Sequence, residues 1–79
     1  MSHWNHRVVR RVYRDEIGGL QEVAYQIHGA YYGLEDKPAI TEEPDHPHGE
    51  TLAELRKDLE RMLRALDKPV LDYETREEI

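Results

Sequence analysis

The clearest pattern of apolar and polar residues lies between residues 51 and 66. Large apolar side chains recur there at steps of one, three or four residues, which places them along one stripe of an α-helix. They are Leu52, Leu55, Leu59, Met62, Leu63 and Leu66. Thr51 can cap the first turn, Glu54 can complete a capping box by reaching back to the Thr51 amide, and Pro69 ends the helix. We therefore predict one capped, amphipathic helix whose apolar stripe packs on a sheet.

The segment from Trp4 to Tyr13 has the two-residue period of a β-strand and is rich in the residues that favour strands. One of its faces carries more apolar bulk, and we place that face inward. It consists of Trp4, His6, Val8, Arg10 and Val12. Gly18 and Gly19 follow and can take the positive φ angles of a hairpin turn, so a second, antiparallel strand is expected next.

The second strand is predicted from about residue 21 or 22 to Tyr32. Val23, Tyr25 and Ile27 share one face and are its core candidates. Gly29 interrupts that face, which indicates either a bulge or a close approach by another element, because glycine has no side chain to pack.

The remaining elements complete the predicted fold. Residues 39–41 fit a short third strand at a sheet edge, and the prolines at positions 44 and 47 make residues 42–49 a loop. The result is an α+β fold, an antiparallel three-stranded sheet in β-β-β-α order with one amphipathic helix packed on one face. Residues 1–73 are expected to form a single domain in which residues 70–73 pack back as an extended segment. The acidic residues 74–79 are expected to be a disordered tail.

The composition is that of a small acidic protein. The chain has 79 residues, a net charge of −6 and no cysteine, so disulfides and thiolate chemistry are excluded and a cytoplasmic location is expected. No apolar run reaches the roughly 20 residues of a membrane span. The sequence contains no phosphate loop, nucleophile elbow or metalloprotease motif. We therefore predict a protein that is not an enzyme and needs no cofactor.

Five histidines raise the question of a metal site. His46 and His48 flank Pro47 in an acid-rich loop beside Asp45 and Glu50. A dedicated site needs three or four ligands held at fixed distances, which a surface loop does not supply by itself. Metal binding through this loop is an alternative to the main prediction, which assigns no metal ligand.

The first strand carries four arginines among aromatic rings. Cations and aromatic faces together are what single-stranded RNA binding uses, so an RNA-binding domain is a further alternative, although the net negative charge opposes it. Our main prediction is a non-catalytic interaction or regulatory protein whose partner is another protein. Homodimer formation through a strand edge or an open sheet face is left open. The candidate interaction surface consists of Arg7, Arg11, Tyr13, Glu42 and Glu43.

Several stretches form a recognisable pattern, among them Trp4-Asn5, Arg7-Val8-Val9-Arg10, Gly49-Glu50-Thr51 and most of the helix through to Leu71. Together they resemble a family of small uncharacterised bacterial proteins, and the resemblance spans nearly the whole chain. It implies no activity. A looser similarity, based on element order and the glycine-led helix start, is to the HicB-like antitoxins, whose partial RNase H fold places a three-stranded meander before a helix. That similarity implies a protein-binding role, as an antitoxin or a phage-type inhibitor.

Overall fold

The computed structural model describes residues 3–15, 17–19, 21–33 and 36–79. Its elements are β1 (His3–Arg14), β2 (Gln21–Tyr32), β3 (Ala39–Ile40), α1 (Leu52–Leu63), the 3-10 helix η1 (Arg64–Asp67) and β4 (Leu71–Asp72). The strands form one sheet in the order β3-β2-β1-β4. Neighbouring strands are antiparallel, except that β4 runs parallel to β1. The predicted α+β class is confirmed, but the sheet is mixed and has four strands where three antiparallel strands were predicted.

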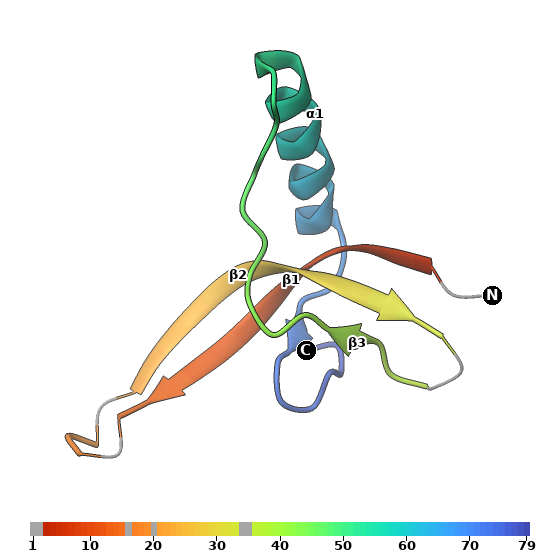
Figure 1. Ribbon diagram of the computed structural model, residues 1–79. Helices are drawn as coiled ribbons and strands as arrows, with labels where there is room; N and C mark the ends of the chain where they lie inside the picture. Colours follow the sequence, from red (N-terminus) through yellow and green to blue (C-terminus); the bar gives the residue numbers. More distant parts are fainter. Residues whose placement is uncertain (1–2, 16, 20, 34–35) are drawn as a thin grey trace.

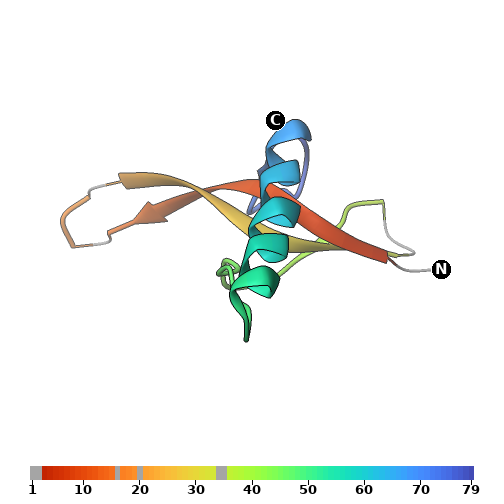
Figure 2. The same cartoon turned by 90° about the horizontal axis from the view of Figure 1, so that it is seen from above.

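A long, twisted hairpin of β1 and β2 dominates the sheet (Figure 1, Figure 2). Its register is unbroken along both strands. Gly19 has a φ of +69° and its amide donates to the Asp15 carbonyl at 2.8 Å, which confirms the predicted glycine turn. Val23 and Tyr25, predicted as core residues, are exposed because the turn end of the hairpin extends beyond the segments that cover the sheet.

β3 is a short edge strand, as predicted, and the chain after it continues along β2. The Thr41 amide donates to the Gly29 carbonyl at 3.0 Å, and the Asp45 amide donates to the Ile27 carbonyl at 2.8 Å. Gly29 stays in register without a bulge. A Cβ on Gly29 would lie 3.2 Å from Thr41 Cγ2, so glycine permits the close approach of this segment.

The centre of β1 is buried on both of its faces. Val8 and Val9, which point to opposite sides of the strand, are both buried. Val9 packs in a fully buried cluster with Ala30 and Leu71. The prediction that the face containing Trp4 and Val8 forms the core is therefore only partly right, because Trp4 is half exposed. On the other face, the side chain of Leu71, which pairs with Val9 from β4, packs with Val9 and Ala30, and Tyr32 and Tyr73 pack against this cluster.

After β4 the chain turns back on itself. The Asp72 amide donates to the Glu77 carbonyl, and the Ile79 amide donates to the Val70 carbonyl, both at 2.8 Å. Residues 74–79, predicted as a disordered tail, form this hydrogen-bonded turn in the structure.

α1 stands away from the sheet and contacts it only at its base (Figure 1, Figure 2). Met62 and Ala65 are the buried residues of the helical segment. The radius of gyration is 14.2 Å, compared with about 12 Å expected for a compact chain of this length. The predicted packing of the apolar stripe on one sheet face is therefore wrong. In the described ranges, no helix is long and apolar enough to cross a membrane.

Candidate interaction surface

The N-terminus of α1 is fixed by side chains that the sequence singles out. Thr51 is the N-cap, and its Oγ1 accepts from the Glu54 amide at 3.1 Å. Glu54 Oε2 accepts from the Glu50 amide at 2.9 Å, one residue before the amide that the capping box predicts. Gly49 lies so close to this turn that a Cβ would overlap the Leu55 amide nitrogen. Only glycine therefore fits at position 49 without displacing the helix start.

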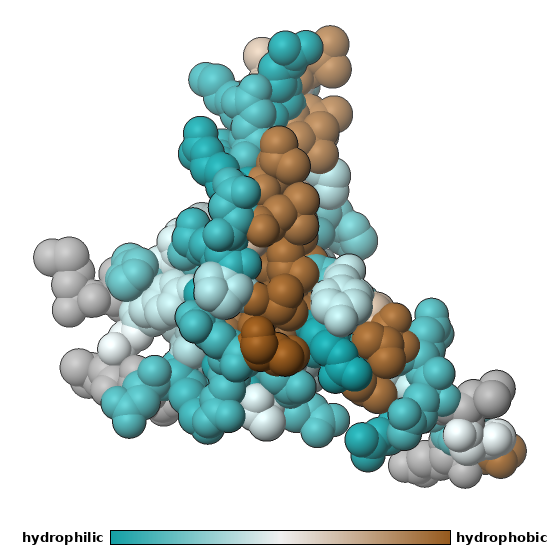
Figure 3. All heavy atoms as spheres, turned by 180° about the vertical axis from the view of Figure 1, so that it is seen from behind, coloured by the Kyte–Doolittle hydropathy of each residue, from teal (hydrophilic) through white to brown (hydrophobic). Residues whose placement is uncertain are grey.

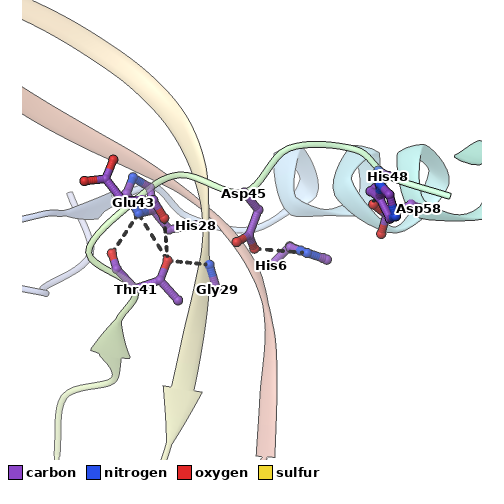
Figure 4. Close-up of polar contacts among 8 residues, drawn as sticks. All are labelled: His6, His28, Gly29, Thr41, Glu43, Asp45, His48 and Asp58. Carbon is purple, nitrogen blue, oxygen red and sulfur yellow. Dashed lines mark hydrogen bonds and ion pairs between the residues drawn. The ribbon is translucent and has the colours of Figure 1, made fainter.

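Polar contacts hold the ascending loop of residues 41–50 against β1 and α1 (Figure 4). At its lower end, Asp45 Oδ2 lies 3.3 Å from His6 Nε2 on β1. At its upper end, the His48 amide donates to Asp58 Oδ2 on α1 at 2.8 Å. The loop thus links the sheet to the helix, and none of these contacts uses the apolar side of α1.

The leucines that the sequence assigns to the core form an exposed strip along the helical segment (Figure 3). We call this strip the leucine face, and it consists of Leu52, Leu55, Leu59, Leu63 and Leu66. Leu52 is 81% exposed, Leu59 47%, and Leu63 and Leu66 are each 63% exposed, while Leu55 is partly buried. A groove of about 470 Å³ follows it, lined by four of these leucines with Arg56 and Glu60. Contiguous apolar patches on a monomer typically mark interaction sites.

The leucine face and the sheet-facing side of α1 are different sides of the helix. Met62 and Ala65 are the buried residues of the helical segment, and at about 100° per residue Leu59 lies about 60° around the α1 axis from Met62. The stripe seen in the sequence spans about 100° of arc with Met62 at one edge. One edge of the stripe therefore meets the sheet, and the rest is left uncovered by the described residues.

Arg7, predicted on an interaction surface, is only 6% exposed. Its guanidinium donates to the Tyr32 hydroxyl at 2.8 Å and to the Pro69 carbonyl at 2.6 Å, and lies 3.5 Å from the Glu78 carboxylate. The Tyr32 hydroxyl donates in turn to Asn5 Oδ1 at 3.0 Å. Arg7 thus ties β1 to the chain after the helix and presents no exposed cation.

The other predicted residues lie towards the turn end of β1 and in the loop after β3. The Arg11 guanidinium stacks on the rings of Tyr73 and Tyr13, at 4.1 and 4.8 Å from their centroids. It also donates to the Glu42 carbonyl at 3.1 Å. The side chains of Glu42 and Glu43 are exposed and form no ion pair with a described residue. The structure therefore brings Arg11, Tyr13 and the Glu42 backbone together.

A second exposed surface, which we call the basic pocket, lies where the helical segment meets β1. It has a volume of about 400 Å³ and is lined by Trp4, Asn5, His6, Arg61, Arg64, Ala65 and Lys68. The side chains of Arg61, Arg64 and Lys68 form no ion pair or hydrogen bond with any residue that the structure describes. This pocket is not evident from the sequence, because Trp4 and the three cations lie about sixty positions apart in the chain.

The histidines occupy separate places. His28 is fully buried, with Nδ1 2.9 Å from the Thr41 carbonyl oxygen. His6 lies on the other face of the hairpin, because it pairs with the glycine that follows His28. His46 and His48 are exposed. Within the described ranges, no three metal-ligating side chains converge.

Comparison with known proteins finds no protein-family model, no curated protein and no solved structure that matches this chain. Its function is therefore argued from the leucine face and the basic pocket.

Proposed function

We propose that this protein is a small non-catalytic interaction or regulatory protein that binds a protein partner through the leucine face. The observation behind this proposal is that the leucine face is exposed on a helix that the rest of the chain already fixes in place. Fully burying one leucine stabilises a protein by roughly 1.5–3 kcal/mol. A chain this short buries little apolar surface on folding, so leaving several leucines exposed forgoes a large share of its possible stabilisation. Because the cap, the loop and the helix base already fix α1, little ordering entropy opposes binding.

The order of elements supports a regulatory role by analogy. β1, β2 and β3 precede a helix whose start carries Gly49, Glu50 and Thr51, which are the features behind the similarity to HicB-like antitoxins. Analogy of this kind suggests a class of function and does not identify a partner. A toxin encoded beside this protein would be the first partner to test.

A photo-reactive amino acid incorporated at position 59 in the native host would cross-link to the partner on irradiation. The cross-linked partner could then be identified and purified. The purified partner should bind the wild-type protein, and Leu59→Asp should weaken that binding by about a hundredfold, because it places a charge in the apolar contact. Lys57→Asp is the matched control, since it introduces the same residue on the opposite side of α1. A partner that binds Leu59→Asp as tightly as wild type would refute the proposal.

The basic pocket favours a second candidate function, binding of single-stranded nucleic acid. Trp4 is half exposed and can stack on a base, while Arg61, Arg64 and Lys68 are available for phosphates. This site differs from the arginine strand predicted from the sequence, in which Arg7 is buried. The net charge of −6 opposes the interaction, so the affinity should depend steeply on salt.

Trp4 is the only tryptophan in the chain, so its fluorescence reports directly on the basic pocket. Single-stranded oligoribonucleotide should quench it at low salt, and three phosphate contacts should give a log–log salt slope of about −2. Replacing Arg61 and Arg64 together by alanine should abolish the quenching. Arg14→Ala, at the turn end of the hairpin, should not. Emission that RNA leaves unchanged at low salt would exclude this candidate.

A further inference from the structure

The leucines of the leucine face are spaced symmetrically about Leu59. Its members are separated by three, four, four and three residues, so the series reads the same in both directions from Leu59. We propose that this face is covered by the leucine face of a second copy of the chain, with the two helices antiparallel and a two-fold axis beside Leu59. This inference rests on the proposed function, because it names the partner of the same surface.

Antiparallel pairing about this axis brings the leucines together in matching layers. Within α1, Leu55 of one copy lies beside Leu63 of the other and Leu59 meets its own counterpart, and Leu52 lies beside Leu66, which continues the strip in the 3-10 helix η1. Packed helices lie about 8–10 Å apart, which lets each leucine insert between those of the facing helix. In a two-fold contact of this kind every pairing occurs twice, so each copy covers the same strip on the other.

The charges beside the leucine face are compatible with the antiparallel arrangement. Arg56 and Glu60 line one flank of the groove. The two-fold axis brings this flank to the same flank of the second copy. Arg56 of one helix then lies about 3 Å along the axis from Glu60 of the other, at 1.5 Å per residue. Each Glu60 then has its own Arg56 one turn away and Arg56 of the second copy as neighbours, while the two Glu60 carboxylates also lie only about 3 Å apart along the axis, so this like-charge contact partly offsets the two opposite-charge pairs.

The position of the sheet favours this arrangement. α1 rises from the sheet at its C-terminal end (Figure 1), so antiparallel helices place the two sheets at opposite ends of the pair. A parallel pair would bring both sheets to the same end. It would also turn the flank of Arg56 towards the sheet-facing side of the other helix, where Met62 lies.

Single cysteines test the geometry, because the chain has none of its own. Leu59→Cys should form a disulfide-linked dimer under mild oxidation. A mixture of Leu52→Cys and Leu66→Cys should form the mixed disulfide, whereas Leu52→Cys alone should stay unlinked, because its counterpart lies at the far end of the pair. Lys57→Cys, on the opposite side of α1, is the control that should stay unlinked. Self-linkage of Leu52→Cys would overturn the antiparallel arrangement.

Sedimentation equilibrium tests the self-association itself. The wild-type mass should approach twice the 9.4 kDa of one chain as concentration rises. Leu59→Asp should raise the dissociation constant by at least about a hundredfold and remain a monomer, while Lys57→Asp should behave as wild type. Circular dichroism should show that the Leu59→Asp variant is folded, as expected for a substitution on the exposed face of α1.

Two negative results are distinguishable. A wild-type protein that stays monomeric at every concentration overturns the second copy as occupant, but a purified partner that depends on Leu59 would still uphold the proposed function. If a purified partner binds the Leu59→Asp variant as tightly as it binds wild type, the proposed function is refuted.

Discussion

Replacing Leu71 and Leu63 by alanine separates the core of this fold from its exposed helix face. The sequence pattern gives Leu63 a place in the apolar helix stripe and Leu71 only a place in a returning segment. The structure reverses their importance. Leu71 is 1% exposed and packs with Val9 and Ala30, whereas more than half of Leu63 is exposed.

The expected costs follow from these exposures. Leu71→Ala removes a buried side chain and leaves a cavity, so it should lower the free energy of unfolding by about 3 kcal/mol, within the roughly 2–5 kcal/mol typical of such changes. Leu63 buries only about a third of its surface, so Leu63→Ala should cost about 1 kcal/mol or less. Alanine's slightly better helix propensity further reduces that cost. A chain of this size has a total stability on the order of 5–10 kcal/mol, so the first variant loses a large part of it.

Urea unfolding followed by circular dichroism measures both costs. The protein concentration must be low enough to keep copies apart, because burial between copies would add to the effect of Leu63→Ala. At high protein concentration the destabilisation caused by Leu63→Ala should increase, while the destabilisation caused by Leu71→Ala should change less. If Leu63→Ala costs as much as Leu71→Ala at low concentration, the helix face packs on its own sheet and our assignment of the core is wrong.

Three further substitutions test how the chain is held together. Gly49→Ala should cost more than about 2 kcal/mol in urea unfolding, because its Cβ overlaps the Leu55 backbone, while Gly33→Ala has open space and should change little; equal costs would contradict this. Thr51→Ala should cost about 1 kcal/mol through loss of the N-cap, and an unchanged midpoint would show that the cap contributes nothing. Arg7→Ala should cost about 1–3 kcal/mol in thermal unfolding, because the partly buried Tyr32 hydroxyl and the Pro69 carbonyl lose their donor, and a neutral result would show that water replaces it.

Features fixed by neighbours in sequence could be predicted. The start of α1 at Thr51 and the turn at Gly19 depend on capping and on backbone angles within a few residues. The close approach at Gly29 was one of two expected outcomes, because a missing side chain allows either a bulge or a neighbour. These local rules do not depend on how the elements finally pack.

Features that depend on distant pairing could not be predicted. β4 lies beside Val9 although Leu71 is far away in sequence, and the Leu71 side chain that this pairing places next to Val9 helps to bury the face of β1 that the local pattern places outward. The apolar stripe predicts a helix from about residue 52 to 66, of which residues 52–63 are α-helical and the rest is the 3-10 helix η1. Its periodicity is the same whether the stripe packs on a sheet or on a partner. The basic pocket combines Trp4 with cations of the helix end, and no sequence window contains both.

The way α1 is held explains how its leucines can stay exposed. A helix of 12 residues is marginal in water by itself, so it needs support from the rest of the chain. That support comes from the Thr51 cap, the bond between His48 and Asp58, and the contact of Met62 and Ala65 with the sheet. Because none of these contacts uses the leucine face, folding of one copy leaves it available. Burial of that face by a second copy would therefore stabilise α1 and its loop directly, and would leave the turn end of the hairpin unaffected.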